Sequence, residues 1–182
     1  MLFNFRREAK PFAVYVELMK SAMQGGLGSY PKIVVNGHNE PQILYYDGVT
    51  DYLSYAYPQD LATYHPNCGP GGNTWRCVGI SNMVQSASDM DLAIGPNTTR
   101  PQLAWTNEDG MSQTWVHHAK YVGWFGNGNC GEDYIATPGG IQLQYAWECH
   151  QTAEVTLNAL YAYVSIQVDD DNQPVIAFNT GD

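Results

Sequence analysis

The sequence is poor in charged residues, and basic ones are especially few. Only 14% of residues are charged, and eight Lys and Arg stand against eighteen Asp and Glu, which gives a net charge of −10. Binding to nucleic acid or to an anionic membrane surface needs clustered basic side chains. The chain also lacks a run of about 20 apolar residues that could cross a bilayer. The composition therefore argues against nucleic acid as a partner and against membrane insertion.

Familiar catalytic and metal-binding motifs are missing as well. There is no G-x-S-x-G, no H-x-x-x-H and no H-x-H. His117 and His118 are adjacent, but neighbouring strand residues point to opposite faces, so the two cannot share one metal. The acidic run Asp169, Asp170 and Asp171 could hold calcium through its oxygens, although such runs are more often solvated turns. No catalytic residue and no other cofactor is predicted.

What the chain does contain is a repeat. "PQILYYD" at 41–47 returns as "PQLAWTN" at 101–107 and "PVIAFNT" at 174–180. Asn67-Cys68-Gly69 returns as Asn129-Cys130-Gly131, and the W-x-C of 75–77 returns at 147–149. Agreement at several independent points makes chance matching improbable, and fixed-period similarity indicates a repeat architecture.

Each unit predicts a meander of four short antiparallel strands. Aromatic residues make up 13% of the chain, with thirteen Tyr and five Trp, which is typical of sheets. In the first unit the strands are expected at 33–35, 42–46, 52–57 and 74–80, separated by turn residues such as Asn36-Gly37 and Asp47-Gly48. Proline at the start of the second strand removes no ladder hydrogen bond. The fold class is therefore all-β, built from repeated four-stranded antiparallel sheets.

Four-stranded sheets repeated radially are the blades of a β-propeller. The stretch "GSYPKIVVNGHNEPQILYYDGVTDYLSYA…NCGPGGNTWRC" resembles the propeller repeats of secreted bacterial proteins that are distantly related to the BNR repeat of sialidases. The resemblance covers residues 25–182 and implies a blade at 28–80, a second at 88–152 and half a blade at 163–182. The sialidase Asp-box, S-x-D-x-G-x-x-W, is absent.

The beginning of the chain is expected to complete that half-blade. Residues 2–20 hold two β-like runs, and their spacing to Pro41 matches the spacing that precedes the later prolines. They are interpreted as the last two strands of a blade whose first two strands are 163–182, which gives about three blades per chain. A short helix over residues 11–24 is the alternative.

The four cysteines occupy matched positions, one pair in each complete unit. They are expected to form the disulfides Cys68–Cys77 and Cys130–Cys149, because two soft ligands per unit at irregular spacing do not suit a metal. Disulfides favour a secreted, extracellular location. No secretory signal precedes them, so a leader is expected to have been removed or the chain to be a segment of something larger.

Candidate binding residues come from the ends of the second strands. Tyr46, Asp47, Trp105 and Asn107 could stack on and hydrogen-bond to sugars, although packing between sheets is the commoner use of such aromatics. Asn97 begins an N-x-T glycosylation sequon in an expected turn. The carboxylates at positions 47, 51, 108 and 109 are the candidates for glycoside hydrolysis, which needs a pair on one face.

These features favour a secreted, non-enzymatic repeat protein with a structural or binding role outside the cell. Three blades are too few to close a ring, so the expected partner is the chain itself, joined head to tail by strand exchange into a six-bladed ring or a filament. A carbohydrate-binding propeller lectin is the alternative. A sialidase-like glycoside hydrolase is the third reading.

Overall fold

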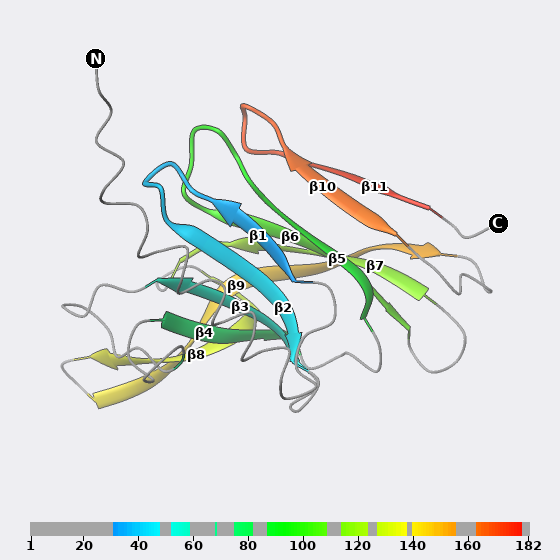
Figure 1. Cartoon of the computed structure of the whole chain (residues 1–182). Coiled ribbons are helices and arrows are strands. Elements are labelled where there is room, and N and C mark those ends of the chain that lie inside the picture. Colours follow the sequence, from blue (N-terminus) through cyan, green and yellow to red (C-terminus); the bar gives the residue numbers. More distant parts are fainter. Residues whose placement is uncertain are drawn as a thin grey trace, which may run out of the picture.

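The structure is a computed structural model that describes residues 31–47, 52–58, 68, 75–81, 87–108, 114–123, 127–137, 140–155 and 163–179. All regular secondary structure in these ranges is β (Figure 1). None of the described residues belongs to a helix long and apolar enough to cross a membrane. The segment 2–20, predicted to complete a split blade, lies outside the described residues.

The first unit is an antiparallel meander of four strands. They are β1 (Lys32–Val35), β2 (Pro41–Asp47), β3 (Tyr52–Pro58) and β4 (Trp75–Ser81), and each pairs with the next. The predicted strands agree with these to within one residue at every end. This agreement confirms the prediction for the first unit.

The second unit has one strand more than the sequence predicted. Its strands are β5 (Ala87–Ile94), β6 (Pro101–Glu108), β7 (Thr114–Tyr121), β8 (Cys130–Thr137) and β9 (Gly140–Val155), in the order β5-β6-β7-β9-β8. The expectation of four strands in this unit was wrong, because Cys130–Thr137 forms an additional strand, β8. The alternating stretch "IQLQY" at 141–145 lengthens β9 and gives β8 a partner along its whole length.

The third unit is a hairpin of β10 (Val164–Val168) and β11 (Pro174–Phe178). One bridge between Gly79 of β4 and Glu132 of β8 joins the first two sheets at their outer edges. The hairpin is not hydrogen-bonded into that sheet and packs beside β5 and β6 (Figure 1). The chain is therefore all-β, with antiparallel sheets of four, five and two strands.

The register of pairing confirms the repeat. Each repeated proline opens the second strand of its unit and lies opposite the last residue of the first strand: Pro41 opposite Val35, Pro101 opposite Ile94 and Pro174 opposite Val168. The W-x-C motifs also match, since Trp75 bridges to Cys68 and Trp147 pairs with Cys130. Positions aligned in sequence are therefore equivalent in space.

The three units pack face against face in chain order. We define the forward face of a unit as the side that carries Leu44 in the first unit, Ala104 in the second and Ala177 in the third. The back face is the opposite side, which carries Ile33, Leu92 and Ile166 at equivalent positions.

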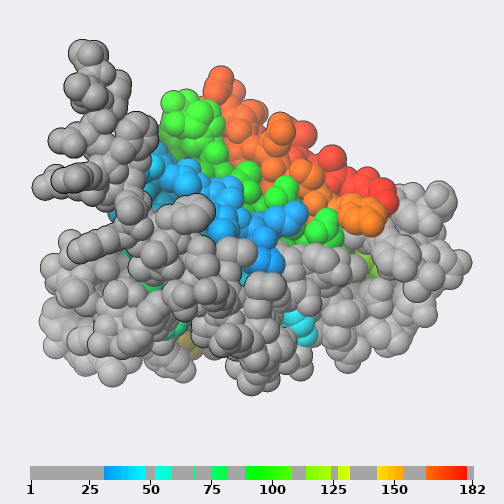
Figure 2. Space-filling view, in the orientation of Figure 1, coloured from blue at the N-terminus to red at the C-terminus, as the bar shows by residue number. Residues whose placement is uncertain are grey.

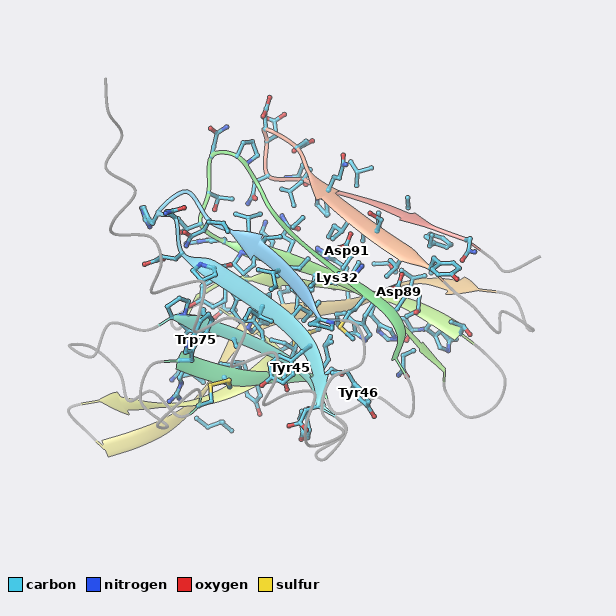
Figure 3. The ribbon with its side chains drawn as sticks, viewed as in Figure 1. Lys32, Tyr45, Tyr46, Trp75, Asp89 and Asp91 are labelled. Carbon is cyan, nitrogen blue, oxygen red and sulfur yellow. A yellow bond between two sulfur atoms is a disulfide. The ribbon has the colours of Figure 1, made fainter. Side chains whose placement is uncertain are left out.

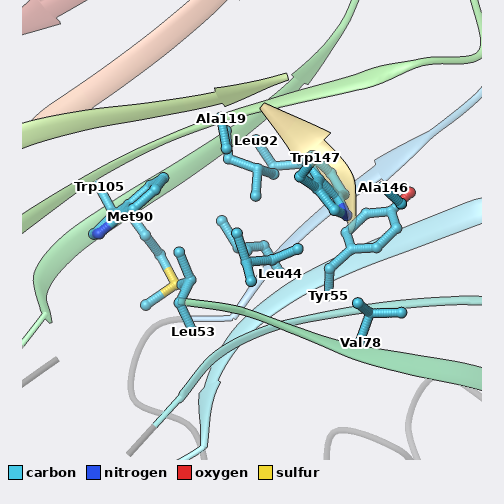
Figure 4. Close-up of a cluster of buried hydrophobic side chains, with 12 residues drawn as sticks. Leu44, Leu53, Tyr55, Val78, Met90, Leu92, Trp105, Ala119, Ala146 and Trp147 are labelled. Atoms are coloured by element: carbon cyan, nitrogen blue, oxygen red, sulfur yellow. The ribbon is translucent and has the colours of Figure 1, made fainter. Parts of the chain in front are cut away.

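The main core lies between the forward face of the first unit and the back face of the second. Leu44, Leu53 and Tyr55 pack there against Leu92 and Trp105 (Figure 4). The indole of Trp147 is central, with Tyr55 and Tyr121 contacting it edge to face at centroid distances of 5.0 and 5.4 Å. Each such aromatic pair adds about 1 kcal/mol beyond its buried area.

A smaller core repeats this arrangement one unit further along. Ala104 and Val116 of the second unit's forward face pack against Val164 and Ile166 of the third unit's back face. The same face-to-face contact therefore occurs twice in one chain.

Candidate functional site: a cavity beside the second sheet

The residues predicted to bind a ligand occupy matched places in two units. Asp47 and Asn107 are equivalent in register, as are Tyr46 and Thr106. Trp105 is 2% exposed and Asn107 is 4% exposed, while Tyr46 packs against the main core. The indole of Trp105 therefore has no face open to solvent on which a sugar could stack, although the other three positions stay predictions.

The recurring N-C-G and W-x-C motifs have a structural explanation. Both disulfides form as predicted, Cys68–Cys77 and Cys130–Cys149, and the described residues contain no free cysteine. The Asn129 side chain pairs with the backbone of one residue: its Nδ2 donates to the Cys149 carbonyl at 3.1 Å, and its Oδ1 accepts from the Cys149 N–H at 2.7 Å. The motif therefore holds the cysteine-bearing loop end against the last strand.

The acidic run in the β10–β11 turn has a local role. Asp169 Oδ1 accepts the N–H groups of Asp171 and Gln173 at 3.0 and 2.7 Å. Asn36 makes the equivalent bonds in the β1–β2 turn with its neutral amide. The position shared by Asn36 and Asp169 therefore needs a hydrogen-bond acceptor rather than a charge. Within the described residues, no group of three or more metal-binding side chains occurs.

Two other predicted features lie in turns. Asn97, the candidate glycosylation residue, is exposed in the β5–β6 turn, and its Nδ2 is 3.4 Å from the Asp170 carbonyl of the next unit. Asn36 and Gly37 lie in the first turn, as predicted. Residues 36–40 connect β1 to β2 there, and Asn39 takes the left-handed conformation, with φ of 62°.

The two adjacent histidines lie on opposite faces, as predicted. His118 Nε2 is 2.9 Å from Gln102 Oε1 on the forward face. His117 stacks on the Trp105 indole on the back face, with ring centroids 5.1 Å apart and an angle of 13° between planes. Burial lowers the pKa of both, that of His118 to about 4, so both rings are neutral at neutral pH.

The Trp105–His117 stack lies in the wall of a cavity of about 320 Å³. Tyr52 contributes from the first unit, and Asn129, Tyr145 and the Cys130–Cys149 disulfide contribute from the second. Tyr145 is 39% exposed, so the cavity reaches the surface there. The cavity lies where the edges of the two sheets meet, near the Gly79–Glu132 bridge.

Two nitrogens of this stack, Trp105 Nε1 and His117 Nε2, are buried without a hydrogen-bond partner and have almost no accessible surface of their own. Both side chains are more than nine-tenths buried. Figure 4 shows the nitrogen end of the Trp105 indole on the side away from Leu44 and Trp147. An unpaired buried polar atom costs about 1–3 kcal/mol, so native proteins rarely keep one without a partner.

The sequence did not predict a set of hydrogen bonds that joins the second and third units. Asp89 Oδ2 accepts the N–H of Val164 at 3.0 Å, and Asp91 Oδ2 accepts both the N–H of Ile166 and the hydroxyl of Ser165, each at 3.0 Å (Figure 3). Two acidic residues at i and i+2 on a strand indicate one shared face. Nothing local, however, points to a partner strand more than 70 residues away.

Comparison with protein-family models, curated proteins and solved structures finds no match for this chain.

Proposed function

We propose that the chain is a non-enzymatic repeat protein of β-propeller type that assembles head to tail with further copies of itself outside the cell. The single observation that carries this is the repeated packing of forward face on back face, which occurs twice within the chain. A contact that a sequence already makes with itself twice is one that another copy can make again.

The propeller arrangement is supported by the first strands of the three units. β1, β5 and β10 lie side by side, as the innermost strands of neighbouring blades do (Figures 1 and 2). The two disulfides support an oxidising location.

The two ends of this array expose apolar side chains. On the back face of the first unit, Ile33 is 41% and Val35 is 57% exposed, although Leu92 at the position equivalent to Ile33 is only 4% exposed. On the forward face of the third unit, Val175 is 61% exposed, whereas the equivalent Gln42 and Gln102 are buried. These are the surfaces that a second copy would cover.

The test is the mass of the intact chain in solution, measured by light scattering after gel filtration, beside the variant Val175→Lys. The intact chain is expected to form oligomers, and the variant a monomer, because a lysine cannot be buried in an apolar contact without a partner. Thr99→Lys, at an exposed turn position, is the matched control and should assemble normally. A monomeric intact chain would contradict the proposal.

Strand exchange is the more detailed form of this proposal. It assigns residues 2–20 to the open edge of β11 in a neighbouring copy. Deleting residues 1–20 should then abolish assembly without unfolding the two disulfide-linked units. Among the described residues no strand pairs with the outer edge of β11. An unpaired strand edge can bind a strand of another chain, which supports strand exchange at this edge.

The glycoside hydrolase reading is tested by activity. A glycoside hydrolase needs two carboxyl groups on one face. Of the four candidates, Asp47 is half-buried at the end of β2, and the side chains at 51, 108 and 109 lie outside those described. Turnover of a panel of chromogenic glycosides would support that reading over the non-enzymatic one.

A further inference from the structure

The contact between the second and third units includes a buried glutamine. Gln102 lies on the forward face of the second unit and is 0% exposed. Its Nε2 donates to the carbonyl of Asn172 at 3.0 Å and lies 3.3 Å from Oδ1 of the same residue. His118 Nε2 lies 2.9 Å from Gln102 Oε1 and so holds the other end of the amide. A side-chain amide of one unit therefore pairs with the first turn of the next unit.

The turn that accepts this glutamine has a particular backbone conformation. It spans residues 169–173, and Asn172 at its fourth place is left-handed, with φ of 61°. The Asn172 N–H donates to the Asp169 carbonyl, and the Asp169 N–H donates to the Gln173 carbonyl, both at 3.0 Å. Asn is one of the few residues that take the left-handed conformation readily. We call a five-residue turn of this form an acceptor turn.

The first turn of the chain is a second acceptor turn. It also has five residues, 36–40, and Asn39 at its fourth place has φ of 62°. The same two backbone hydrogen bonds close it, at 2.9 Å each. The turn of the second unit, 95–100, is one residue longer, and none of its described residues has a positive φ. The first and third units therefore share an acceptor turn that the second unit lacks.

The two acceptor turns differ in whether a unit lies in front of them. The first turns of the three units lie at the same end of the molecule, in chain order (Figure 1). The turn of the third unit accepts Gln102 of the second, but among the described residues no unit lies in front of the first. Asn39 is exposed, and its two oxygens accept no hydrogen bond from the described part of the chain. This acceptor turn is therefore available to a glutamine of another copy.

The third unit has a glutamine on its exposed forward face, on the other strand of the pair. The opposed forward-face residues of the first two strands are Val34 and Gln42 in the first unit, Ala93 and Gln102 in the second, and Gln167 and Val175 in the third. The amide and the apolar residue have thus exchanged strands in the third unit. The Cβ atoms of opposed residues are about 5 Å apart, a distance that a glutamine side chain can span. Gln167 is exposed, and its amide makes no hydrogen bond to the described residues.

We infer that Gln167 of one copy donates its side-chain amide to Asn39 of the next copy and so fixes the register of the head-to-tail contact. The inference rests on the assembly proposed above and adds a polar contact to the apolar one at Ile33 and Val175. Apolar burial is non-directional, whereas a hydrogen bond weakens steeply when its geometry is poor. The amide and its acceptor therefore favour another copy of this chain over an unrelated apolar surface.

The test measures assembly at a series of concentrations by light scattering and compares the concentration at which half of the chains are assembled. Gln167→Val removes the amide and should raise that concentration about fivefold, the effect of losing one hydrogen bond. Gln167→Val combined with Val175→Gln recreates the arrangement of the first two units and should restore the value of the intact chain. Gln173→Val, at an exposed turn position, is the matched control and should assemble as the intact chain does.

A substitution of the acceptor tests the other partner. Asn39→Gly keeps the left-handed conformation and the carbonyl but lacks Oδ1. Alone, it should weaken assembly by less than Gln167→Val does, because the carbonyl can still accept. Added to Gln167→Val, it should have no further effect, because the donor is already absent. Both positions are exposed, so circular dichroism spectra should stay unchanged in these variants.

Three results would overturn the inference and leave head-to-tail assembly in place. The first is assembly of Gln167→Val at the same concentration as the intact chain. The second is failure of the exchanged pair, Gln167→Val with Val175→Gln, to restore assembly. The third is an effect of Asn39→Gly that persists in full in Gln167→Val. An intact chain that is monomeric at every concentration would instead overturn this inference and the assembly proposal together.

Discussion

Gly131 occupies a position that a larger residue cannot fill without strain. Its φ is +70°, and a Cβ there would collide with the indole ring of Trp147, which is 1% exposed in the main core. A left-handed residue other than glycine costs about 1–2 kcal/mol, and overpacking a core costs about as much again. We expect Gly131→Ala to lower the free energy of unfolding by about 3 kcal/mol, measured by urea denaturation.

Gly37 is the matched control for that substitution. It lies in an exposed turn, and a Cβ added there meets nothing within 4 Å. Gly37→Ala should leave stability unchanged or raise it slightly, since alanine restricts the unfolded chain. If both variants lost the same free energy of unfolding, the contact with Trp147 would not be the cause of the destabilisation.

His118 makes stability depend on pH. Its pKa in the folded chain is about 4, because burial disfavours the charged ring and because His150 and Lys120 repel it, while Glu148 acts in the opposite sense. The ordinary value is 6.5. Between these values the unfolded chain binds more protons, so the free energy of unfolding should fall as pH drops from about 6.5 to about 4. The loss is on the order of 2 kcal/mol after allowance for screening.

The first unit provides the variant that tests this. Tyr55 is equivalent to His118, and its hydroxyl donates to Gln42 Oε1 at 2.6 Å, just as His118 bonds Gln102. His118→Tyr should keep the hydrogen bond and flatten most of the pH dependence in denaturation curves between about pH 7 and pH 4. A smaller slope should remain, because burial also lowers the pKa of His117. A slope as steep as that of the unaltered chain would assign the effect to other groups.

At the scale of the elements, the β10–β11 hairpin is held by carboxylates as well as by apolar contact. Asp91 accepts two hydrogen bonds from β10, and bonds to a charged group contribute about 1.5–3 kcal/mol each. Asp91→Ala should therefore raise the hydrogen-exchange rate of the hairpin amides by about 100-fold while amides of β2 and β3 keep theirs. Asp91→Asn keeps one acceptor oxygen and should lie between the two. Uniform loss of protection would mean that the units unfold together.

Strand positions were largely predictable, because turn residues and alternation are local signals. The first unit has both, and its strands were predicted to within one residue. β8 was missed because Asn129-Cys130-Gly131 matched Asn67-Cys68-Gly69, which is outside the four strands predicted for the first unit. The role of Asp91 could not be predicted, since it depends on what another strand places opposite. The repeat in the sequence thus predicted which positions of the units are equivalent. The features in which one unit differs from another were seen only in the structure.

At the scale of the whole molecule, the order of contacts gives the chain a direction. Each forward face meets the next back face, so an assembly built on the same contact is heterologous, with a different surface of each copy on either side. A ring and a filament both follow from such a contact, and an isologous dimer does not. This difference can be measured with two variants that each lose one surface.

Ile33→Lys removes the exposed back-face contact and leaves the forward face of the third unit intact, whereas Val175→Lys does the reverse. Each variant alone should be monomeric, because every junction would bury an unpaired lysine. Mixed in equal amounts, they should form a heterodimer and nothing larger, since one intact forward face can meet one intact back face. Native mass spectrometry distinguishes the two chains by mass. A mixture that stays monomeric, or single variants that still form homodimers, would rule out head-to-tail packing through these two faces.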